Sequence, residues 1–125
     1  MTQGFALIID DNMDNVEMCT ILMHIEKYTT MGVYDGSEAI QWLIVNDAPD
    51  VILLDVNMPH IDGRQVYEYI RSESKYAGTK IVVVTANSYM ANLMQSILCS
   101  GDYILQKPFS MLDLQQIIRE IHTPA

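Results

Sequence analysis

Five polar residues that could act together chemically each stand at or shortly beyond the end of a short apolar run: Asp10, Asp11, Asp55, Thr85 and Lys107. Their side chains are three carboxylates, a hydroxyl and an ammonium group. If the runs form parallel strands, these side chains meet at the carboxyl edge of one sheet, where open α/β sheets bind their ligands. Three carboxylates placed close together raise one another's pKa unless positive charge compensates them.

Two sources of positive charge are consistent with this set of side chains. Lys107 provides one charge, and a divalent cation would provide two more. Mg²⁺ is the natural candidate, because it takes hard oxygen ligands, keeps several waters and often meets a substrate phosphate. The three histidines, His24, His60 and His122, are scattered along the chain and match no zinc spacing.

The same groups predict phosphoryl chemistry. A carboxylate can act as the nucleophile and form an aspartyl phosphate, and a metal, a lysine and a hydroxyl can stabilise the charge that develops on the transferred group. The six glycines form neither of the two glycine-rich nucleotide-binding patterns. We therefore expect the phosphoryl donor to be another phosphoprotein or a small phosphate compound.

The strands that would position these groups are runs that are apolar at every position, as expected for strands covered on both faces. Three runs are strong, at residues 5–9, 51–54 and 81–84, and two are weaker, at residues 31–34 and 103–105. Four of these runs, all except residues 31–34, lead directly or within two residues to a polar residue of the candidate set, so the same segments predict both the strands and the chemical site.

Amphipathic segments between the strands predict five helices with one buried face each. The first runs from about Met13 to Tyr28, with a shared face made of Val16, Thr20, Met23 and Lys27. The other helical patterns cover residues 37–44, 65–73, 90–98 and 114–121. Ser37 and Ser110 stand where helix N-caps are expected.

Five strand-then-helix units in succession indicate an α/β fold. We expect a doubly wound, five-stranded parallel sheet with helices on both faces and right-handed crossovers. The 125 residues are close to the commonest size of one domain. The pattern runs from about Gly4 to His122 without a repeat or a linker, so we expect residues 1–125 to be a single domain.

Composition excludes several classes of function. Sixteen acidic residues against seven basic ones leave a net charge of −9, which argues against a nucleic-acid-binding surface and against docking on an anionic membrane. No apolar run approaches the roughly 20 residues of a membrane helix, and the N-terminus shows no signal peptide. The two cysteines, Cys19 and Cys99, are too few for a disulfide framework and fit a reducing cytoplasm.

Four segments, in this order and each at a predicted strand end, resemble the receiver domain of bacterial two-component response regulators. They are Ile8-Ile9-Asp10-Asp11-Asn12, the segment from Leu53 to Gly63, Val83-Val84-Thr85-Ala86-Asn87, and Lys107-Pro108-Phe109. Each segment alone is a weak signal, but the set is specific and covers nearly the whole chain. The resemblance implies a flavodoxin-like fold with strand order 2-1-3-4-5, and a signalling switch that catalyses only its own phosphorylation and dephosphorylation.

The resemblance also implies the ligands of the metal and the acceptor of the phosphoryl group. Asp55 matches the phosphoacceptor. Asp10, Asp11 and Asp55 match the acidic set that binds Mg²⁺, directly or through water, and the backbone carbonyl of Asn57 completes the metal site.

Two further site positions carry over from the family. Thr85 matches the hydroxyl that moves toward the phosphoryl group, and Lys107 matches the family's lysine, whose bond to Pro108 is usually cis. Asn57 and Asn87, two residues beyond Asp55 and Thr85, are expected to tune the lifetime of the phosphoryl group.

The partners follow from the same resemblance. A sensor histidine kinase or a histidine phosphotransfer protein donates the phosphoryl group. Phosphorylation then changes the surface around the fourth helix, fifth strand and fifth helix, which a downstream effector domain or protein reads and which is also a candidate homodimer surface. A stand-alone protein and a domain of a larger protein both fit this sequence.

One position departs from the family pattern. An aromatic residue commonly stands three residues before the lysine, but this position is Ile104, and Tyr103 lies one step earlier. Because successive side chains of a strand point to opposite faces, either Tyr103 is not the switch residue or a bulge rephases the strand. The departure supports an alternative function, a phosphorylation-independent interaction module with the same fold.

Two remaining expectations concern the surroundings of Asp55. A hydrolase that uses an aspartyl phosphate is disfavoured, because Asn57 stands two residues past Asp55, where a hydrolase would carry an acid/base residue. Met58 is expected to be exposed near the site and free to contact a partner.

Cys19 and Cys99 are expected to be buried or half-buried.

Overall fold

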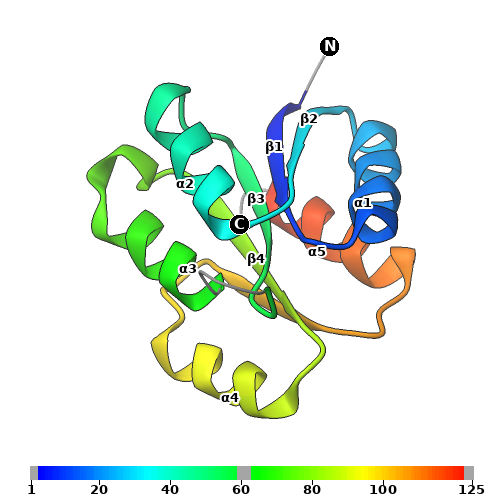
Figure 1. Cartoon of the computed structure of the whole chain (residues 1–125). Helices are drawn as coiled ribbons and strands as arrows, with labels where there is room; N and C mark the ends of the chain where they lie inside the picture. The colour runs from blue at the N-terminus through cyan, green and yellow to red at the C-terminus, as the bar shows by residue number, and fades with distance from the viewer. Residues whose placement is uncertain (1–2, 59–62, 123–125) are drawn as a thin grey trace.

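The computed structural model describes residues 3–58 and 63–122. In chain order the elements are β1 (Gly4–Ile9), α1 (Met13–Ile25), β2 (Tyr28–Val33), α2 (Gly36–Val45), β3 (Val51–Asp55), α3 (Gly63–Ser72), the 3₁₀ turn η1 (Ser74–Tyr76), β4 (Lys80–Thr85), α4 (Ser88–Ile97), β5 (Tyr103–Gln106) and α5 (Met111–His122). Strands and helices alternate along the chain as predicted (Figure 1). His60, and the part of the second motif from Pro59 to Asp62, lie outside the described residues.

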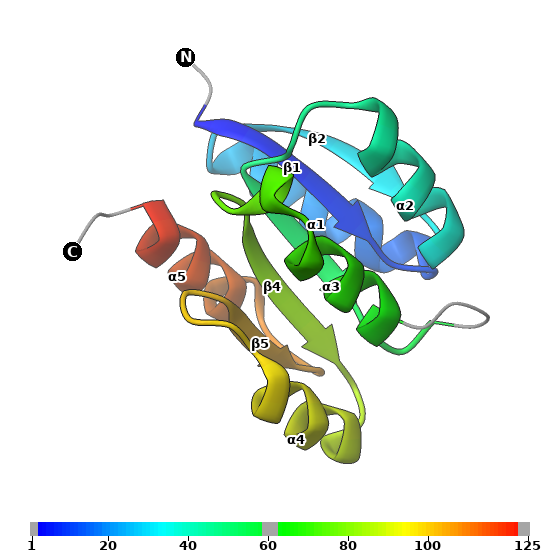
Figure 2. The ribbon, with the colours of Figure 1, turned by 90° about the vertical axis from the view of Figure 1, so that its left-hand side faces the viewer.

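The five strands form one parallel sheet in the order β2-β1-β3-β4-β5. This arrangement confirms the predicted fold class and strand order. β1 and β3 are neighbours, with Ile9 paired to Leu54, and β3 is paired to β4, with Asp55 opposite Val84. The strands therefore end at a common edge, and Figure 2 shows the arrows of β1 and β4 pointing the same way.

Side chains that alternate along each strand fill two separate cores, one on each face of the sheet. Leu7 and Ile9 of β1 belong to the core beneath α2, α3 and α4, whereas Ala6 and Ile8 belong to the core beneath α1 and α5. Burial on both faces explains why the three central strands β1, β3 and β4 read as continuous apolar runs. Figure 1 shows the same layers, with α1 and α5 on one side of the sheet and α2 and α3 on the other.

The first helix is shorter than predicted. It ends at Ile25, and Lys27 takes a positive φ of 73° that turns the chain into β2. Tyr28, predicted to be helical, is instead the buried first residue of that strand. The predicted buried face is wrong at Thr20 and Lys27, because the buried residues of α1 are Val16, Cys19, Leu22 and Met23.

Side chains cap the amino ends of four helices, α1, α2, α4 and α5, and the cap of α2 stands at an unexpected position. The prediction that Ser37 caps the second helix is wrong, because Asp35 Oδ1 accepts the hydrogen bond from Glu38 N at 2.7 Å. Aspartate is as good an N-cap as serine. Ser110 does cap α5: its Oγ accepts from Asp113 N at 3.1 Å, and Asp113 Oδ2 accepts from Ser110 N at 3.0 Å.

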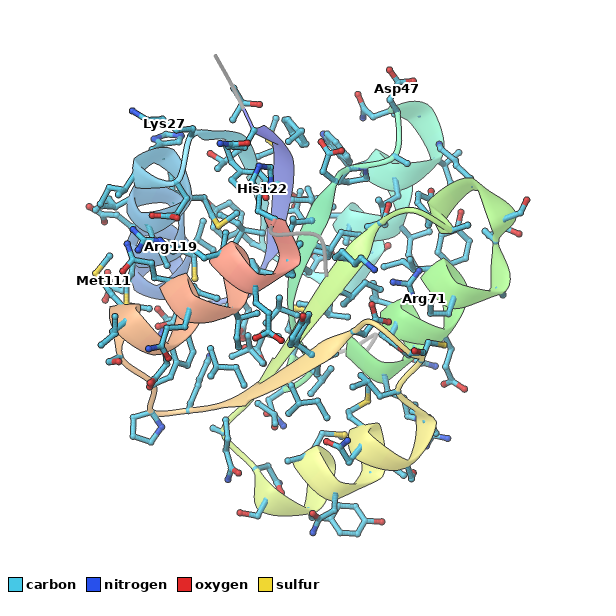
Figure 3. All side chains as sticks on the ribbon, turned by 180° about the vertical axis from the view of Figure 1, so that it is seen from behind. Lys27, Asp47, Arg71, Met111, Arg119 and His122 are labelled. Atoms are coloured by element: carbon cyan, nitrogen blue, oxygen red, sulfur yellow. The ribbon has the colours of Figure 1, made fainter. Side chains whose placement is uncertain are left out.

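A buried ion pair joins α3 to the turn that leads into β5. The Asp102 side chain, only 2% exposed, accepts hydrogen bonds from Arg71 Nε at 2.8 Å and Arg71 Nη2 at 2.7 Å. It also accepts from the Tyr67 hydroxyl at 2.8 Å, and that hydroxyl accepts from Cys99 N at 2.8 Å. The carboxyl end of α4 is therefore anchored to α3, where Arg71 lies beside the start of β5 (Figure 3).

An aromatic stack closes the amino end of β1. The rings of Phe5 and Trp42 have centroids 5.5 Å apart and planes within 5° of parallel. Together with Asn46, Asp47 and Ala48 they line a cavity of about 280 Å³. Trp42 packs at the end of the sheet opposite to the one where Asp10 and Asp55 stand.

Candidate functional site

Two carboxylates of the candidate set lie side by side at the carboxyl edge of the sheet. Asp10 directly follows β1 and Asp55 ends β3, and because these two strands pair, both side chains reach the same place. Both are buried, whereas Asp11 is exposed at the rim. One carboxylate oxygen from each of the three residues lies within 4.8 Å of the other two.

Lys107 brings its ammonium group to the two buried carboxylates. Its Nζ donates to Asp55 Oδ2 at 3.3 Å and to Asp10 Oδ2 at 3.4 Å. Its backbone N donates to Thr85 O at 2.7 Å, which holds the lysine against the end of β4, and its bond to Pro108 is cis. The structure therefore brings Asp10, Asp55 and Lys107 together from three different strand ends.

The buried carboxylate of Asp10 is hard to ionise. Burial is the main cause that raises the pKa of Asp10 above its ordinary 3.8, and the Asp55 carboxylate adds to it. The N–H of Asn12, which donates to Asp10 Oδ1 at 2.9 Å, and the charge of Lys107 oppose this rise without cancelling it. For Lys107, burial would lower the pKa, but the carboxylates of Asp55 and Asp10 outweigh burial and raise it.

The donor set fits a small, hard divalent cation. One ammonium group faces three carboxylates, so two negative charges remain uncompensated within a few ångströms. Carboxylate oxygens are the ligands that Mg²⁺ prefers, and the exposed position of Asp11 leaves one side open to the waters that Mg²⁺ retains. Asp10, Asp11 and Asp55 are therefore the residues that could hold the ion. Asn57 adds a backbone contact, since its N donates to Asp55 Oδ1 at 2.8 Å.

Thr85 lies at the same edge, but its hydroxyl donates to Asn57 and not to Asp55. Its side chain is fully buried at the end of β4, and its hydroxyl donates to Asn57 Oδ1 at 2.5 Å. The hydroxyl oxygen accepts from Asn87 N at 3.1 Å. The sequence pattern placed Thr85 at this edge, but it held no signal for this hydrogen bond, which depends on side-chain conformation.

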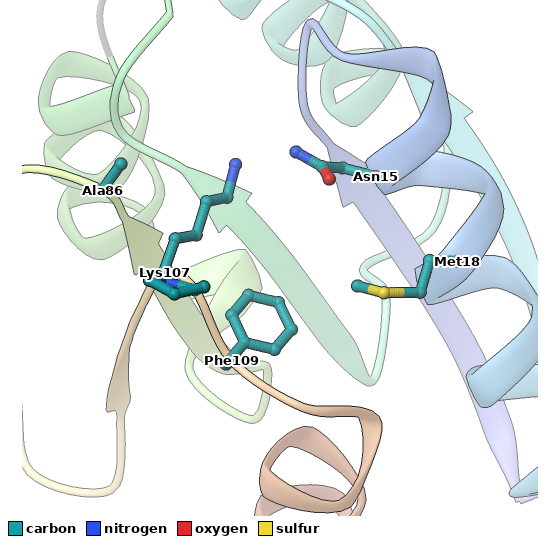
Figure 4. Close-up of a pocket in the computed structure, with 6 residues that line it drawn as sticks. Asn15, Met18, Ala86, Lys107 and Phe109 are labelled. Carbon is teal, nitrogen blue, oxygen red and sulfur yellow. The ribbon is translucent and has the colours of Figure 1, made fainter.

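An apolar cavity of about 430 Å³ opens beside the carboxylates, between α1 and the segment that follows β5. Its lining residues are Asn15, Met18, Ala86, Lys107, Pro108 and Phe109. Figure 4 shows the lysine side chain extending across this space toward Asn15, with Met18 and Phe109 facing each other. Sequence reasoning missed Asn15 and Met18; their position in the first two turns of the helix after Asp10 was the available signal.

The position of the candidate switch aromatic is now defined. β4 and β5 pair in regular register, with Val82 opposite Tyr103 and Val83 opposite Ile104, so no bulge rephases β5. Ile104 packs in the core beneath α2, α3 and α4, and Tyr103 in the core beneath α1 and α5. Because side chains alternate along β4, Thr85 faces the Ile104 side. Tyr103 is therefore on the opposite face of the sheet from Thr85.

Two expectations about side-chain burial are wrong, one for Met58 and one for Cys99. Met58 is buried, 6% exposed, because it packs in the core beneath α2, α3 and α4 rather than facing a partner. Cys99 is exposed at the end of α4, whereas Cys19 is buried as expected. Burial, aided by the charge of Asp10, raises the pKa of the Cys19 thiol to about 11.

Comparison with known proteins gives a consistent result. The family model of the response regulator receiver domain matches residues 6–119. The sensor protein GacS of Pseudomonas syringae pv. syringae is 36% identical over 117 residues, which cover 90% of this chain and 13% of that protein. The chain spans less than half the length of each of the curated relatives that it matches here.

Solved structures share the fold over nearly the whole chain. The chemotaxis response regulator CheY4 of Vibrio cholerae has a TM-score of 0.83 and 25% identity, covering 96% of this chain and 99% of that one. The receiver domain of the sensor histidine kinase PA1611 of Pseudomonas aeruginosa, solved with a magnesium ion in its active-site cleft, has a TM-score of 0.80 and 24% identity, covering 95% and 97%. Within residues 3–58 and 63–122, no helix is both long and apolar enough to cross a membrane.

Proposed function

Because the chain belongs to the response regulator receiver domain family, we propose that it is a phosphorylation-dependent signalling switch whose phosphoacceptor is Asp55. The observation that carries the proposal is the meeting of three carboxylates and one ammonium group at a single sheet edge. Asp10 and Asp55 are both buried, bonded to Lys107 and held by a backbone N–H, from Asn12 and Asn57 respectively. We assign the phosphoryl group to Asp55 because it ends the central strand β3 and matches the phosphoacceptor position of the family. We propose that residues 1–125 form one receiver domain.

The chemistry follows from the positions of the side chains. A carboxylate oxygen of Asp55 attacks the phosphorus of a phosphohistidine or a small acyl phosphate, the bond from phosphorus to the donor breaks, and the donor atom keeps the electron pair. Mg²⁺ held by Asp10, Asp11, Asp55 and the carbonyl of Asn57 would neutralise charge on the carboxylates and the phosphoryl oxygens. Lys107 lies 3.3 Å from Asp55 Oδ2 and offers its ammonium to the incoming group.

The hydroxyl of Thr85 provides the response to phosphorylation. It leaves Asn57 and donates to a phosphoryl oxygen, which draws the connection between β4 and α4 toward the site. Water later hydrolyses the aspartyl phosphate and restores the carboxylate. The protein acts on its own phosphoryl group and is not a turnover enzyme.

The partners that we propose match this chemistry. The donor is a sensor histidine kinase or a histidine phosphotransfer protein, in line with relatives named as a sensor protein and a sensor histidine kinase. The response is read by an effector domain or protein, or by a second copy, at the surface of α4, β5 and α5. We propose that the protein acts in the cytoplasm. We also propose that this domain binds neither nucleic acid nor a membrane, because its net charge is −9.

Mass spectrometry after incubation with acetyl phosphate and Mg²⁺ tests the proposal. We expect wild-type protein to gain the mass of one phosphoryl group and Asp55→Asn to gain none. Thr85→Ala is expected to take up the group, because it keeps the carboxylates and the lysine. Absence of an adduct on the wild type, or an adduct on Asp55→Asn, would contradict the proposal.

The second candidate is a phosphorylation-independent interaction module. It is favoured by one observation, the placement of Tyr103 on the face of the sheet opposite to Thr85, which removes the aromatic from the side to which the hydroxyl points. This candidate predicts that neither Mg²⁺ nor acetyl phosphate changes the NMR spectrum or the binding of a partner.

A further inference from the structure

The side chain of Asn57 contacts the connection between β4 and α4. Its Oδ1 accepts a hydrogen bond from the Thr85 hydroxyl at 2.5 Å and another from the backbone N of Ala86 at 3.0 Å. A backbone N–H can only donate and the amide nitrogen of asparagine cannot accept, so the Ala86 contact fixes which way the amide points. The acceptor oxygen therefore faces Thr85.

The Thr85 hydroxyl has one proton and, among the described residues, two acceptors in reach. Asn57 Oδ1 lies at 2.5 Å and Asn87 O at 3.3 Å, and the shorter contact is the stronger bond. The hydroxyl oxygen already accepts from Asn87 N, and the side chain is fully buried. The proton can be donated to Asn57 or to a phosphoryl oxygen on Asp55, but not to both at once.

Asn57 also lies between the phosphoacceptor and the fourth helix. Its backbone N donates to Asp55 Oδ1 at 2.8 Å. The Ala86 that it binds is followed by Asn87, whose side chain caps the first turn of α4. One residue thus contacts the reacting carboxylate through its backbone and, through its side chain, the connection that leads into α4.

We propose that the Asn57 side chain is a latch, defined as the hydrogen bonds from Thr85 and Ala86 to Asn57 Oδ1, that holds the hydroxyl in its unphosphorylated position. The inference rests on the proposed function, and it adds that the latch sets how much of the active conformation exists before phosphorylation. Asn57 is a positioning residue, because it acts through Thr85. Losing the hydrogen bond from Thr85 to Asn57 Oδ1 raises the ratio of active to inactive conformers roughly three- to tenfold, the effect of one neutral hydrogen bond.

Asn57→Ala is a selective variant, because alanine keeps the backbone N that donates to Asp55 and the carbonyl proposed as a metal ligand. The readout is the NMR signal of the Thr85 methyl group, with wild-type protein phosphorylated by acetyl phosphate and Mg²⁺ as the active reference. In unphosphorylated Asn57→Ala, we expect this signal to move toward the reference. We also expect the variant to be phosphorylated by acetyl phosphate roughly three- to tenfold faster than the wild type.

Two control variants distinguish the loss of the latch from a general destabilisation of the connection between β4 and α4. Asn57→Asp keeps an acceptor oxygen at the same place, so without divalent cations its Thr85 signal is expected to stay at the wild-type position. Asn87→Ala removes the cap of α4 and leaves both bonds of the latch, so it is expected to leave the signal there too.

The outcomes distinguish the two proposals. If the wild type takes up a phosphoryl group but Asn57→Ala leaves the Thr85 and Ala86 signals unmoved, only the latch is refuted. It is also refuted if Asn57→Asp shifts the Thr85 signal as far as Asn57→Ala does. If the wild type takes up no phosphoryl group, the proposed function itself fails.

Discussion

Asp10 is a buried carboxylate that has one nearby positive charge, on Lys107, and one nearby negative charge, on Asp55. Lys107 is 3.4 Å from its Oδ2, but the same ammonium also serves Asp55. The raised pKa of Asp10 means that the folded protein tolerates this charge less well than water does. If this site binds a cation, as proposed, the fold is less stable when the cation is absent, as is common where function and stability compete.

This electrostatic cost predicts a pH-dependent stability. Between the ordinary pKa of 3.8 and the raised value, the folded protein holds a proton that the unfolded chain has lost, so stability falls as pH rises through this interval. Asp10→Asn is therefore expected to raise the melting temperature by a few degrees near neutral pH without divalent cations, and the gain is expected to shrink toward pH 3.8. Thermal unfolding across this range measures it.

Asp47→Asn is the matched control, because Asp47 is an exposed carboxylate. It should leave the melting temperature unchanged at every pH. A gain for Asp10→Asn that persists undiminished at acid pH would show that its origin is not the titration of Asp10.

At the scale of elements, the two ends of α4 are held differently. Its carboxyl end is fixed by the Tyr67 hydroxyl, which bonds both Cys99 N and the buried Asp102. Its amino end follows Thr85 and Ala86, which donate the neutral hydrogen bonds of the Asn57 latch. Only Met94 of this helix is fully buried. A change at Thr85 is therefore expected to move the amino end of α4 about an anchored carboxyl end.

Two arginines of α3 allow a matched test of the anchor. Arg71→Met leaves Asp102 buried without its charge partner, and losing one partner of a buried pair typically reduces the free energy of unfolding by about 3–5 kcal/mol. Arg64→Met breaks an exposed pair with Glu68, for which about 0–0.5 kcal/mol is expected. Urea denaturation measures both, and equal losses would show that the Asp102 pair is not an anchor.

The start of α2 gives a second comparison at this scale. Asp35→Ala removes the acceptor for Glu38 N and should reduce the free energy of unfolding by about 1 kcal/mol. Ser37→Ala, inside the first turn, should change it by no more than a few tenths, because alanine favours helices. Chemical denaturation of the two variants decides which residue is the cap, and a larger loss for Ser37→Ala would contradict the structure.

At the scale of the whole molecule, the acidic residues behind the net charge of −9 do not all affect stability equally. Three of the sixteen acidic residues share one site, so folding concentrates negative charge that an unfolded chain keeps apart. A divalent cation that binds this site only in the folded state must therefore stabilise the fold. Cation binding at this cluster and the global stability of the protein are therefore expected to be linked.

Mg²⁺ is accordingly expected to raise the melting temperature, with about 2.7 kcal/mol of stabilisation at a concentration one hundred times the dissociation constant. Sodium chloride at equal ionic strength should not reproduce the rise, and EDTA should reverse it. Asp11→Asn is the informative variant, because Asp11 is exposed and its loss should change stability little without Mg²⁺ while weakening the response to it. A full response in Asp11→Asn would argue against the proposed ligand set.

Most of the fold was predictable from the sequence because each central strand is a continuous apolar run that ends in a polar site residue, as Val51–Asp55 does. The meeting of Asp10, Asp55 and Lys107 followed from parallel topology alone. The end of α1 was not predictable from periodicity, because it depends on the positive φ of Lys27. Nor was the bond from Thr85 to Asn57, since a side-chain rotamer decides it.

The stack of Phe5 on Trp42 has a practical consequence for spectroscopy. Trp42 is the only tryptophan. Its partner Phe5 lies on β1, five residues before Asp10, which corresponds to about 16 Å at the usual rise of a strand. The fluorescence of Trp42 should therefore follow the unfolding of β1 and α2 while remaining insensitive to events at the carboxylates. The protein thus carries an intrinsic optical probe of folding that is independent of signalling.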